Sequence, residues 1–71
     1  MEVFEIVTYD GKSLSLIKAD NERQALCMYL MNHEELNDMM LWQSVNYPHK
    51  WKLAEYDDEY NYIYARRTYD F

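Results

Sequence analysis

The residue types best suited to molecular recognition gather in the C-terminal third of the chain. Six of the eight tyrosines lie between residues 47 and 71, and four acidic residues fall within five positions there. Tyrosine offers a large, stiff contact surface at low entropic cost, which suits binding a macromolecule better than turning over a substrate. We therefore predict a partner-binding segment made of Glu55, Tyr56, Asp57, Asp58, Glu59, Tyr60, Tyr62, Tyr64, Arg66 and Arg67.

The acidic residues 55–59 admit three interpretations. Clustered carboxylates suit a hard divalent cation, but the Asp-x-Asp-x-Asp-Gly spacing of a calcium loop is missing, so no metal site is predicted. A solvated hairpin tip is the simplest alternative. The third interpretation treats the carboxylates as surrogates for the phosphates of a nucleic acid, presented to a basic groove on a partner.

Arg66 and Arg67 follow the tyrosine-rich stretch directly. Arginine among aromatic residues recurs at the centres of protein interfaces. The same pair could neutralise the acidic residues, or read RNA by stacking as sheet-based RNA-binding domains do. The RNA interpretation needs a positive sheet face, which this acidic chain does not favour.

No arrangement of nucleophile, base and orienting group emerges from the sequence, so an enzyme is not predicted and no cofactor is implied. Cys27 lies among apolar neighbours and reads as a buried structural thiol rather than a nucleophile served by His33 or His49. As the single cysteine, it also excludes an internal disulfide.

Length and charge limit the number of domains and the kinds of binding partner. The 71 residues predict one small domain spanning residues 1–71, and 13 acidic against 7 basic residues give a formal net charge of −6. Such acidity disfavours direct binding to nucleic acid or to an anionic membrane, and it favours a protein with a basic surface. The N-terminus lacks a signal-peptide pattern and no apolar run is long enough to span a membrane, which predicts a cytoplasmic protein.

The elements that must position these residues begin with a predicted β-hairpin over residues 2–19. A three-residue loop, Tyr9-Asp10-Gly11, with glycine in the left-handed conformation, would pair Ile6 with Leu14 and Phe4 with Leu16. The same register sets Glu2 beside Lys18.

Residues 20–42 are predicted to form one long helix. Asp20 or Asn21 can cap its start, and Gln24 completes a pattern similar to a capping box. Apolar residues recur at helical spacing as far as Met40. Residues 32–35 could break the helix in two.

A loop over residues 44–49 precedes two more predicted strands, at residues 50–56 and 60–67. The fold class is therefore α+β, in the order ββαββ, with an antiparallel sheet and the long helix packed on one face. If residues 57–59 form the second hairpin loop, Leu53 opposes Ile63, Trp51 opposes Ala65 and the tyrosines face outward. If only residues 57–58 form it, the tyrosines join the core.

In size, acidity and its combination of tyrosines with carboxylates, the chain resembles a class of small acidic proteins encoded by phages and mobile elements. That class includes inhibitors of host nucleases, glycosylases and CRISPR effectors, some of which are similar to DNA in their display of charge. The resemblance implies an anti-defence role in the host cytosol.

The predicted function is that of a non-enzymatic inhibitor or modulator that binds a basic-grooved protein, for example a nuclease or a CRISPR effector. One alternative is an obligate homo-oligomer, for example a homodimer, with a structural or regulatory role. Another is a binder of a small nucleotide ligand that uses aromatic stacking.

Overall fold

The computed structural model describes residues 1–48, 50–56, 58 and 60–68. Over these residues the chain forms one α-helix, one short 3-10 helix and a single antiparallel sheet of five strands. In chain order the elements are β1 (Glu2–Thr8), β2 (Ser13–Ala19), α1 (Glu22–Met31), η1 (Glu34–Leu36), β3 (Met40–Gln43), β4 (Trp51–Ala54) and β5 (Tyr62–Arg67). The predicted α+β class with an antiparallel sheet and a helix is confirmed, whereas the order ββαββ is matched only in part, because it lacks the strand β3.

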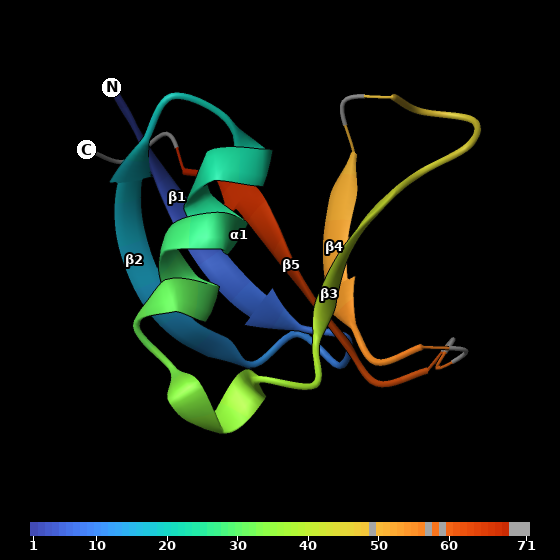
Figure 1. Ribbon diagram of the computed structural model, residues 1–71. Coiled ribbons are helices and arrows are strands. Elements are labelled where there is room, and N and C mark those ends of the chain that lie inside the picture. Colours follow the sequence, from blue (N-terminus) through green and yellow to red (C-terminus); the bar gives the residue numbers. More distant parts are fainter. Residues whose placement is uncertain (49, 57, 59, 69–71) are drawn as a thin grey trace.

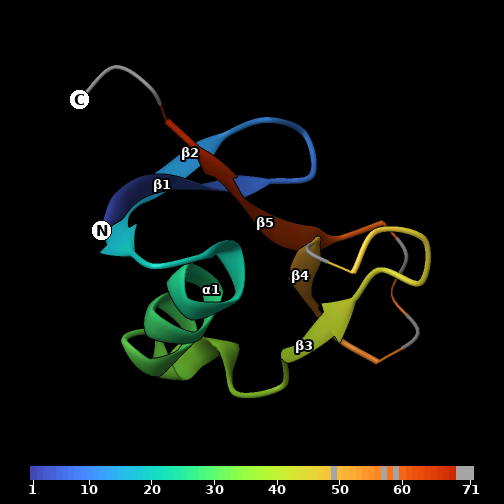
Figure 2. The same ribbon diagram turned by 90° about the horizontal axis from the view of Figure 1, so that it is seen from above.

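The strands lie in the spatial order β2-β1-β5-β4-β3, so the last strand of the chain is the central one. β5 pairs with β1 on one side and with β4 on the other, and it thereby joins the hairpin β1–β2 to the hairpin β3–β4. The sheet curls around α1, which lies on its concave side (Figures 1 and 2). We call the opposite side of the sheet the outer face.

The turn of the first hairpin is confirmed. The backbone N–H of Thr8 donates to the carbonyl of Lys12 at 2.9 Å, and the N–H of Gly11 donates to the carbonyl of Thr8, also at 2.9 Å. Gly11 has φ +92°, the left-handed region that closes a three-residue hairpin loop.

The predicted register beyond that turn is wrong by one residue. Val7 opposes Ser13, as the loop requires, but Ile6 opposes Ser15 and Phe4 opposes Ile17. A β-bulge between Ile6 and Val7 shifts the register, because one strand contributes an extra residue there.

The bulge decides which residues of β2 enter the core. Ala19 becomes fully buried opposite Glu2, and Ile17 packs against the core, while Leu14 and Leu16 are left exposed. Lys18 opposes Val3 instead of Glu2. Side chains alternate between the two faces of a strand, so a shift of one residue exchanges the whole set.

α1 starts as the sequence predicts. The side-chain oxygen of Asn21 accepts a hydrogen bond from the backbone N–H of Gln24 at 2.8 Å, and the Gln24 side chain accepts one from the N–H of Asp20 at 2.6 Å. These bonds satisfy donors that the first helical turn cannot satisfy internally.

The prediction of one helix as far as Trp42 is wrong. α1 ends at Met31 with Asn32 as its C-cap, the single turn η1 follows, and Met40–Gln43 forms a strand that pairs with β4. Apolar residues at positions 39–42 suit a short buried strand as well as a helix, and periodicity alone does not separate the two. The segment forms a strand because its backbone pairs with β4.

The core lies between α1 and the concave side of the sheet. Its fully buried members include Phe4 and Ile6 of β1, Leu26 of α1 and Leu53 of β4. Leu41 of β3 packs against the same cluster from a half-buried position.

Candidate partner-binding surface

The register of β4 and β5 determines which way the tyrosines face. Leu53 opposes Ile63, as predicted for a loop over residues 57–59, so the two-residue alternative is wrong. β4 ends two residues earlier than predicted, at Ala54, and β5 begins two residues later than predicted, at Tyr62, so the connection between them covers residues 55–61. Asp57 and Glu59 lie outside the described residues.

Tyr62 and Tyr64 lie on the outer face, opposite Ala54 and Lys52. The ammonium of Lys52 sits 5.2 Å from the centroid of the Tyr62 ring, a cation–π contact. The Tyr62 and Tyr64 rings lie 6.1 Å apart, and Tyr9 lies 6.2 Å from Tyr62. These side chains form an aromatic row on a face that no helix covers within the described residues (Figure 2).

Part of this row serves the protein's own packing. Val7 and Ala54 are buried although they lie outside the main core cluster, and their strand partners are Tyr64 and Tyr62. Both tyrosines are themselves only half-buried. The outer face therefore has a shallow apolar layer of its own, with ring surface left for contact.

Tyr56 and Tyr60 lie in the β4–β5 connection rather than on a strand, and they are 73% and 76% exposed. The Tyr56 ring lies 6.0 Å from the ring of Trp42, whose indole N–H donates to the Ala54 carbonyl at 3.0 Å. These are the tyrosines most available to a partner, because little of their surface is used internally.

Asp58 holds the connection in shape. Its carboxylate accepts hydrogen bonds from the backbone N–H groups of Asn61 at 2.9 Å and Tyr60 at 3.0 Å. These bonds favour the charged form and hold the pKa of Asp58 below its ordinary value, Asn61 having the larger effect. Of the described predicted acids, Glu55 is fully exposed and Asp58 is half-buried.

Arg66 and Arg67 pair with acidic residues of β1. The Arg66 side chain lies 2.6 Å from the Glu5 carboxylate, and that of Arg67 lies 2.8 Å from Glu2. A hydrogen bond from Ser13, followed by that from Arg66, lowers the pKa of Glu5. The alternative in which the two arginines neutralise the acidic residues of the connection therefore finds no support in the ion pairs of the described residues.

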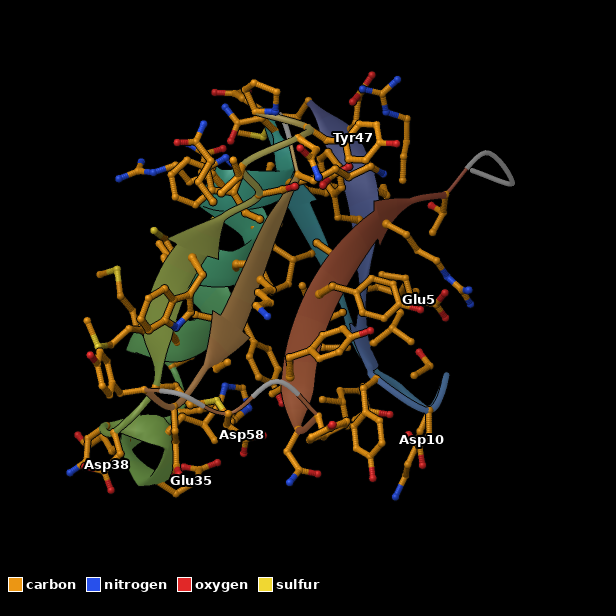
Figure 3. All side chains as sticks on the ribbon, turned by 90° about the vertical axis from the view of Figure 1, so that its right-hand side faces the viewer. Glu5, Asp10, Glu35, Asp38, Tyr47 and Asp58 are labelled. Atoms are coloured by element: carbon orange, nitrogen blue, oxygen red, sulfur yellow. The ribbon has the colours of Figure 1, made fainter. Side chains whose placement is uncertain are left out.

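One end of the molecule collects acidic residues from three separate connections, and we call it the acidic end. Figure 3 shows Asp10, Glu35, Asp38 and Asp58 at this end, with Tyr47 at the opposite one. Its described acids are Asp10, Glu34, Glu35, Asp38, Glu55 and Asp58. The sequence did not indicate that Glu34, Glu35 and Asp38 belong to this acidic surface, because a continuous helix was predicted over these positions.

Most basic residues lie away from the acidic end. Lys50 lies 3.8 Å from Glu22 at the start of α1, and Arg66 and Arg67 lie toward the far end of β5. Of the Lys and Arg residues in the described part of the chain, two accompany the acidic end: Lys12, in the first hairpin turn, and Lys52, whose charge helps to lower the pKa of Asp58. The charge is thus separated along the molecule.

β4 and β5 diverge toward the start of β4 (Figures 1 and 3), and a hollow lies beside them. The ladder between the two strands covers only the pairs from Lys52–Tyr64 to Ala54–Tyr62, so the predicted pairing of Trp51 with Ala65 is absent from it. The hollow has a volume of about 610 Å³ and is lined by Trp42, Gln43, Ser44, Lys50, Trp51, Lys52, Tyr62 and Tyr64. Its position follows from the splayed strands, which the sequence does not reveal.

Two further findings concern the chemistry of the described residues. In that part of the chain, no three His, Cys, Asp or Glu side chains come together in a way that could hold a metal ion. Nor does the described chain contain a helix with the length and apolar character needed to cross a membrane.

Comparison with protein-family models, with curated protein sequences and with solved structures found no match to this chain. The site must therefore be interpreted from its own geometry and charge.

Proposed function

We propose that this chain is a non-enzymatic binding protein that engages a protein with a basic surface through its acidic end and the adjoining exposed tyrosines. The observation that carries the proposal is the placing of Tyr56 and Tyr60, both largely exposed, in the same connection as Glu55 and Asp58. Aromatic anchors beside steering charges are the usual anatomy of a protein interface.

The charge separation supports a basic partner. Acids from three connections lie at one end, where their potentials add and accelerate the encounter with a positive surface. Arg66 and Arg67, which would otherwise suit a phosphate backbone, are paired with Glu5 and Glu2. The surface is therefore better suited to a basic protein than to nucleic acid.

The biological consequence would be inhibition or modulation. A protein that binds nucleic acid presents a basic groove, and an acidic chain seated in it would exclude the natural ligand. A nuclease or a CRISPR effector of a phage's host has the required surface, in keeping with the class that the sequence resembles.

The test begins with capture of a partner from a host lysate on the immobilised chain, followed by purification of that partner and measurement of its binding rates. We expect the quadruple variant Glu34→Gln/Glu35→Gln/Asp38→Asn/Glu55→Gln to associate about tenfold more slowly at low salt, and the difference to shrink as salt screens the charges. Asp20→Asn removes one exposed carboxylate at the end of the molecule opposite the acidic end. It is the control for the single variant Glu35→Gln, and it should leave the association rate unchanged.

The aromatic contribution is tested separately with Tyr56→Ala/Tyr60→Ala. Because affinity differences at one interface reside mostly in dissociation, we expect this variant to dissociate about tenfold faster. If the quadruple variant bound the partner as fast as the unmodified chain at low salt, or if nuclease treatment of the lysate abolished capture, the proposal would be wrong.

A further inference from the structure

The hollow between β4 and β5 differs in charge from the rest of the molecule. The chain carries a net charge of −6, yet the residues that line the hollow include Lys50 and Lys52 and no acidic residue. Lys50 does have an acid nearby, Glu22, but the 3.8 Å separation and the 59% exposure of the lysine side chain make that pairing weak. A local positive site has thus been built into an acidic protein.

The remaining walls are largely aromatic. Both tryptophans of the chain, Trp42 and Trp51, line the hollow together with Tyr62 and Tyr64. Aromatic walls provide flat apolar surface on which a planar ring can stack, at a gain of about 1–3 kcal/mol per base in nucleic-acid complexes. Ser44 and Gln43 add polar groups at the rim.

The size of the hollow matches a small molecule. Its volume of about 610 Å³ falls within the range of ligand pockets, which is about 300–1,000 Å³. The β3–β4 connection that borders it is held by hydrogen bonds: the N–H of Ser44 donates to the Lys50 carbonyl at 2.9 Å, and the Gln43 side chain donates to the Pro48 carbonyl at 2.6 Å. This border is therefore formed before any ligand arrives.

We propose that the hollow is a binding site for a nucleoside monophosphate, whose base stacks on the aromatic walls while Lys52, assisted by Lys50, holds the phosphate. The site uses Lys50 and Lys52, whereas the proposed function uses the acids of the acidic end and the exposed tyrosines Tyr56 and Tyr60. The inference goes beyond the proposed function, and it stands or fails independently of the protein partner.

The direct test is a titration with adenosine 5′-monophosphate followed by tryptophan fluorescence. Because both tryptophans line the hollow, any occupant must change their emission. We expect saturable quenching by the nucleotide, with adenosine and inorganic phosphate each binding at least about tenfold more weakly, since each supplies only half of the contacts.

The matched variants are Lys52→Gln, which removes a lysine from the hollow, and Lys18→Gln, which removes one from β2. We expect Lys52→Gln to weaken nucleotide binding about tenfold and Lys18→Gln to leave it unchanged. Circular dichroism confirms that both variants fold.

A measurement on the unmodified chain keeps the proposal open to refutation if a variant unfolds. Amide chemical shifts recorded by NMR during the same titration should move at residues 42–44, 50–52 and 62–64. The absence of saturation up to about 1 mM nucleotide, equal affinity of Lys52→Gln and Lys18→Gln, or shifts centred elsewhere would each overturn the proposal.

Discussion

Asp58 illustrates how much the role of one carboxylate depends on its backbone neighbours. In the sequence it is one of four acids within five positions, and nothing there sets it apart from the other three. In the fold its carboxylate accepts hydrogen bonds from the backbone N–H groups of Tyr60 and Asn61. Part of its hydrogen-bonding capacity is therefore used within the chain itself. The acids of the acidic end therefore divide into those that shape a loop, such as Asp58, and those that display charge, such as Glu35 and Glu55.

Asp58 gives a prediction about pH. Its pKa is lowered in the folded protein, so its carboxylate stabilises the fold fully above the unfolded value of 3.8, and that contribution is lost as the pH falls through the folded pKa. We expect Asp58→Asn to unfold at a lower temperature than the unmodified chain at neutral pH. The gap should close as the pH falls below 3.8, when melting is followed by circular dichroism.

The control for this prediction is Glu55→Gln, which removes an exposed carboxylate from the same connection. It should show no such convergence with pH. An Asp58→Asn variant that melted together with the unmodified chain at neutral pH would show that these hydrogen bonds do not stabilise the loop.

Gly11 gives a second prediction at this scale. A Cβ at this position would meet no atom within 4 Å, so the cost of a substitution comes from the backbone conformation alone. We expect Gly11→Ala to reduce the free energy of unfolding by about 1 kcal/mol, and Gly11→Asn to reduce it less, because asparagine tolerates a positive φ. Urea denaturation of both variants measures the difference, and an unchanged Gly11→Ala midpoint would contradict it.

At the scale of elements, the sequence correctly predicts those features that depend on residues close to one another in the chain. The Asn21 cap and the Gly11 turn depend on residues within four positions of each other, and both appear as predicted. The pairing of Leu53 with Ile63 is one of the two registers that the sequence leaves open, the one expected for a loop over residues 57–59.

The elements that were predicted wrongly depend on distant partners. The strand β3 exists because β4 pairs with it, and the segment alone is equally compatible with a helix. The bulge in the first hairpin places Ile17 and Ala19 against α1, a requirement of the tertiary core that the turn residues do not encode. Most of the acidic end and the hollow were missed for the same reason, since the acidic end brings together residues of three connections and the hollow brings together residues of three strands.

The two faces of β3 can be distinguished by mutation. Leu41 packs against the core opposite Leu53, while Met40 lies on the outer face and is 51% exposed. We expect Leu41→Ala to cost about 1–2 kcal/mol of the free energy of unfolding and Met40→Ala less than about 0.5 kcal/mol. Chemical denaturation measures both, and a larger cost for Met40→Ala would contradict the register of β3.

For the whole molecule, the separated charges act on stability as well as on binding. Like charges gathered at one end repel one another, and among the described residues the six acids of the acidic end are accompanied by only two lysines, Lys12 and Lys52. The surface that would steer a partner therefore weakens the isolated fold at low ionic strength.

This repulsion predicts a response to salt. We expect the melting temperature to rise as the ionic strength increases from about 10 mM to about 150 mM, because the screening length falls from about 30 Å to about 8 Å. The quadruple variant of the acidic end should melt higher than the unmodified chain at low salt and respond less to salt. A steeper salt response in the variant would show that these acids are stabilised by neighbours instead of repelled.

The exposed tyrosines and the outer face also bear on self-association. If the outer face and the exposed tyrosines bind a different protein, the chain alone should be monomeric. We therefore expect sedimentation velocity to give one species of monomer mass at micromolar concentration, independent of dilution. A dimer under these conditions would favour the homo-oligomer alternative, in which copies of this chain cover the face.

The central position of β5 has a consequence for the order in which the protein can be made. Of the five strands, β5, which joins the two hairpins, leaves the ribosome after the other four, and its partner β1 leaves before them. Until residues 62–67 have emerged, the nascent chain holds two hairpins with no shared ladder, and a hairpin alone is at best marginally stable. The fold is therefore completed in one late step, and the tyrosines of β5 are aligned in that same step.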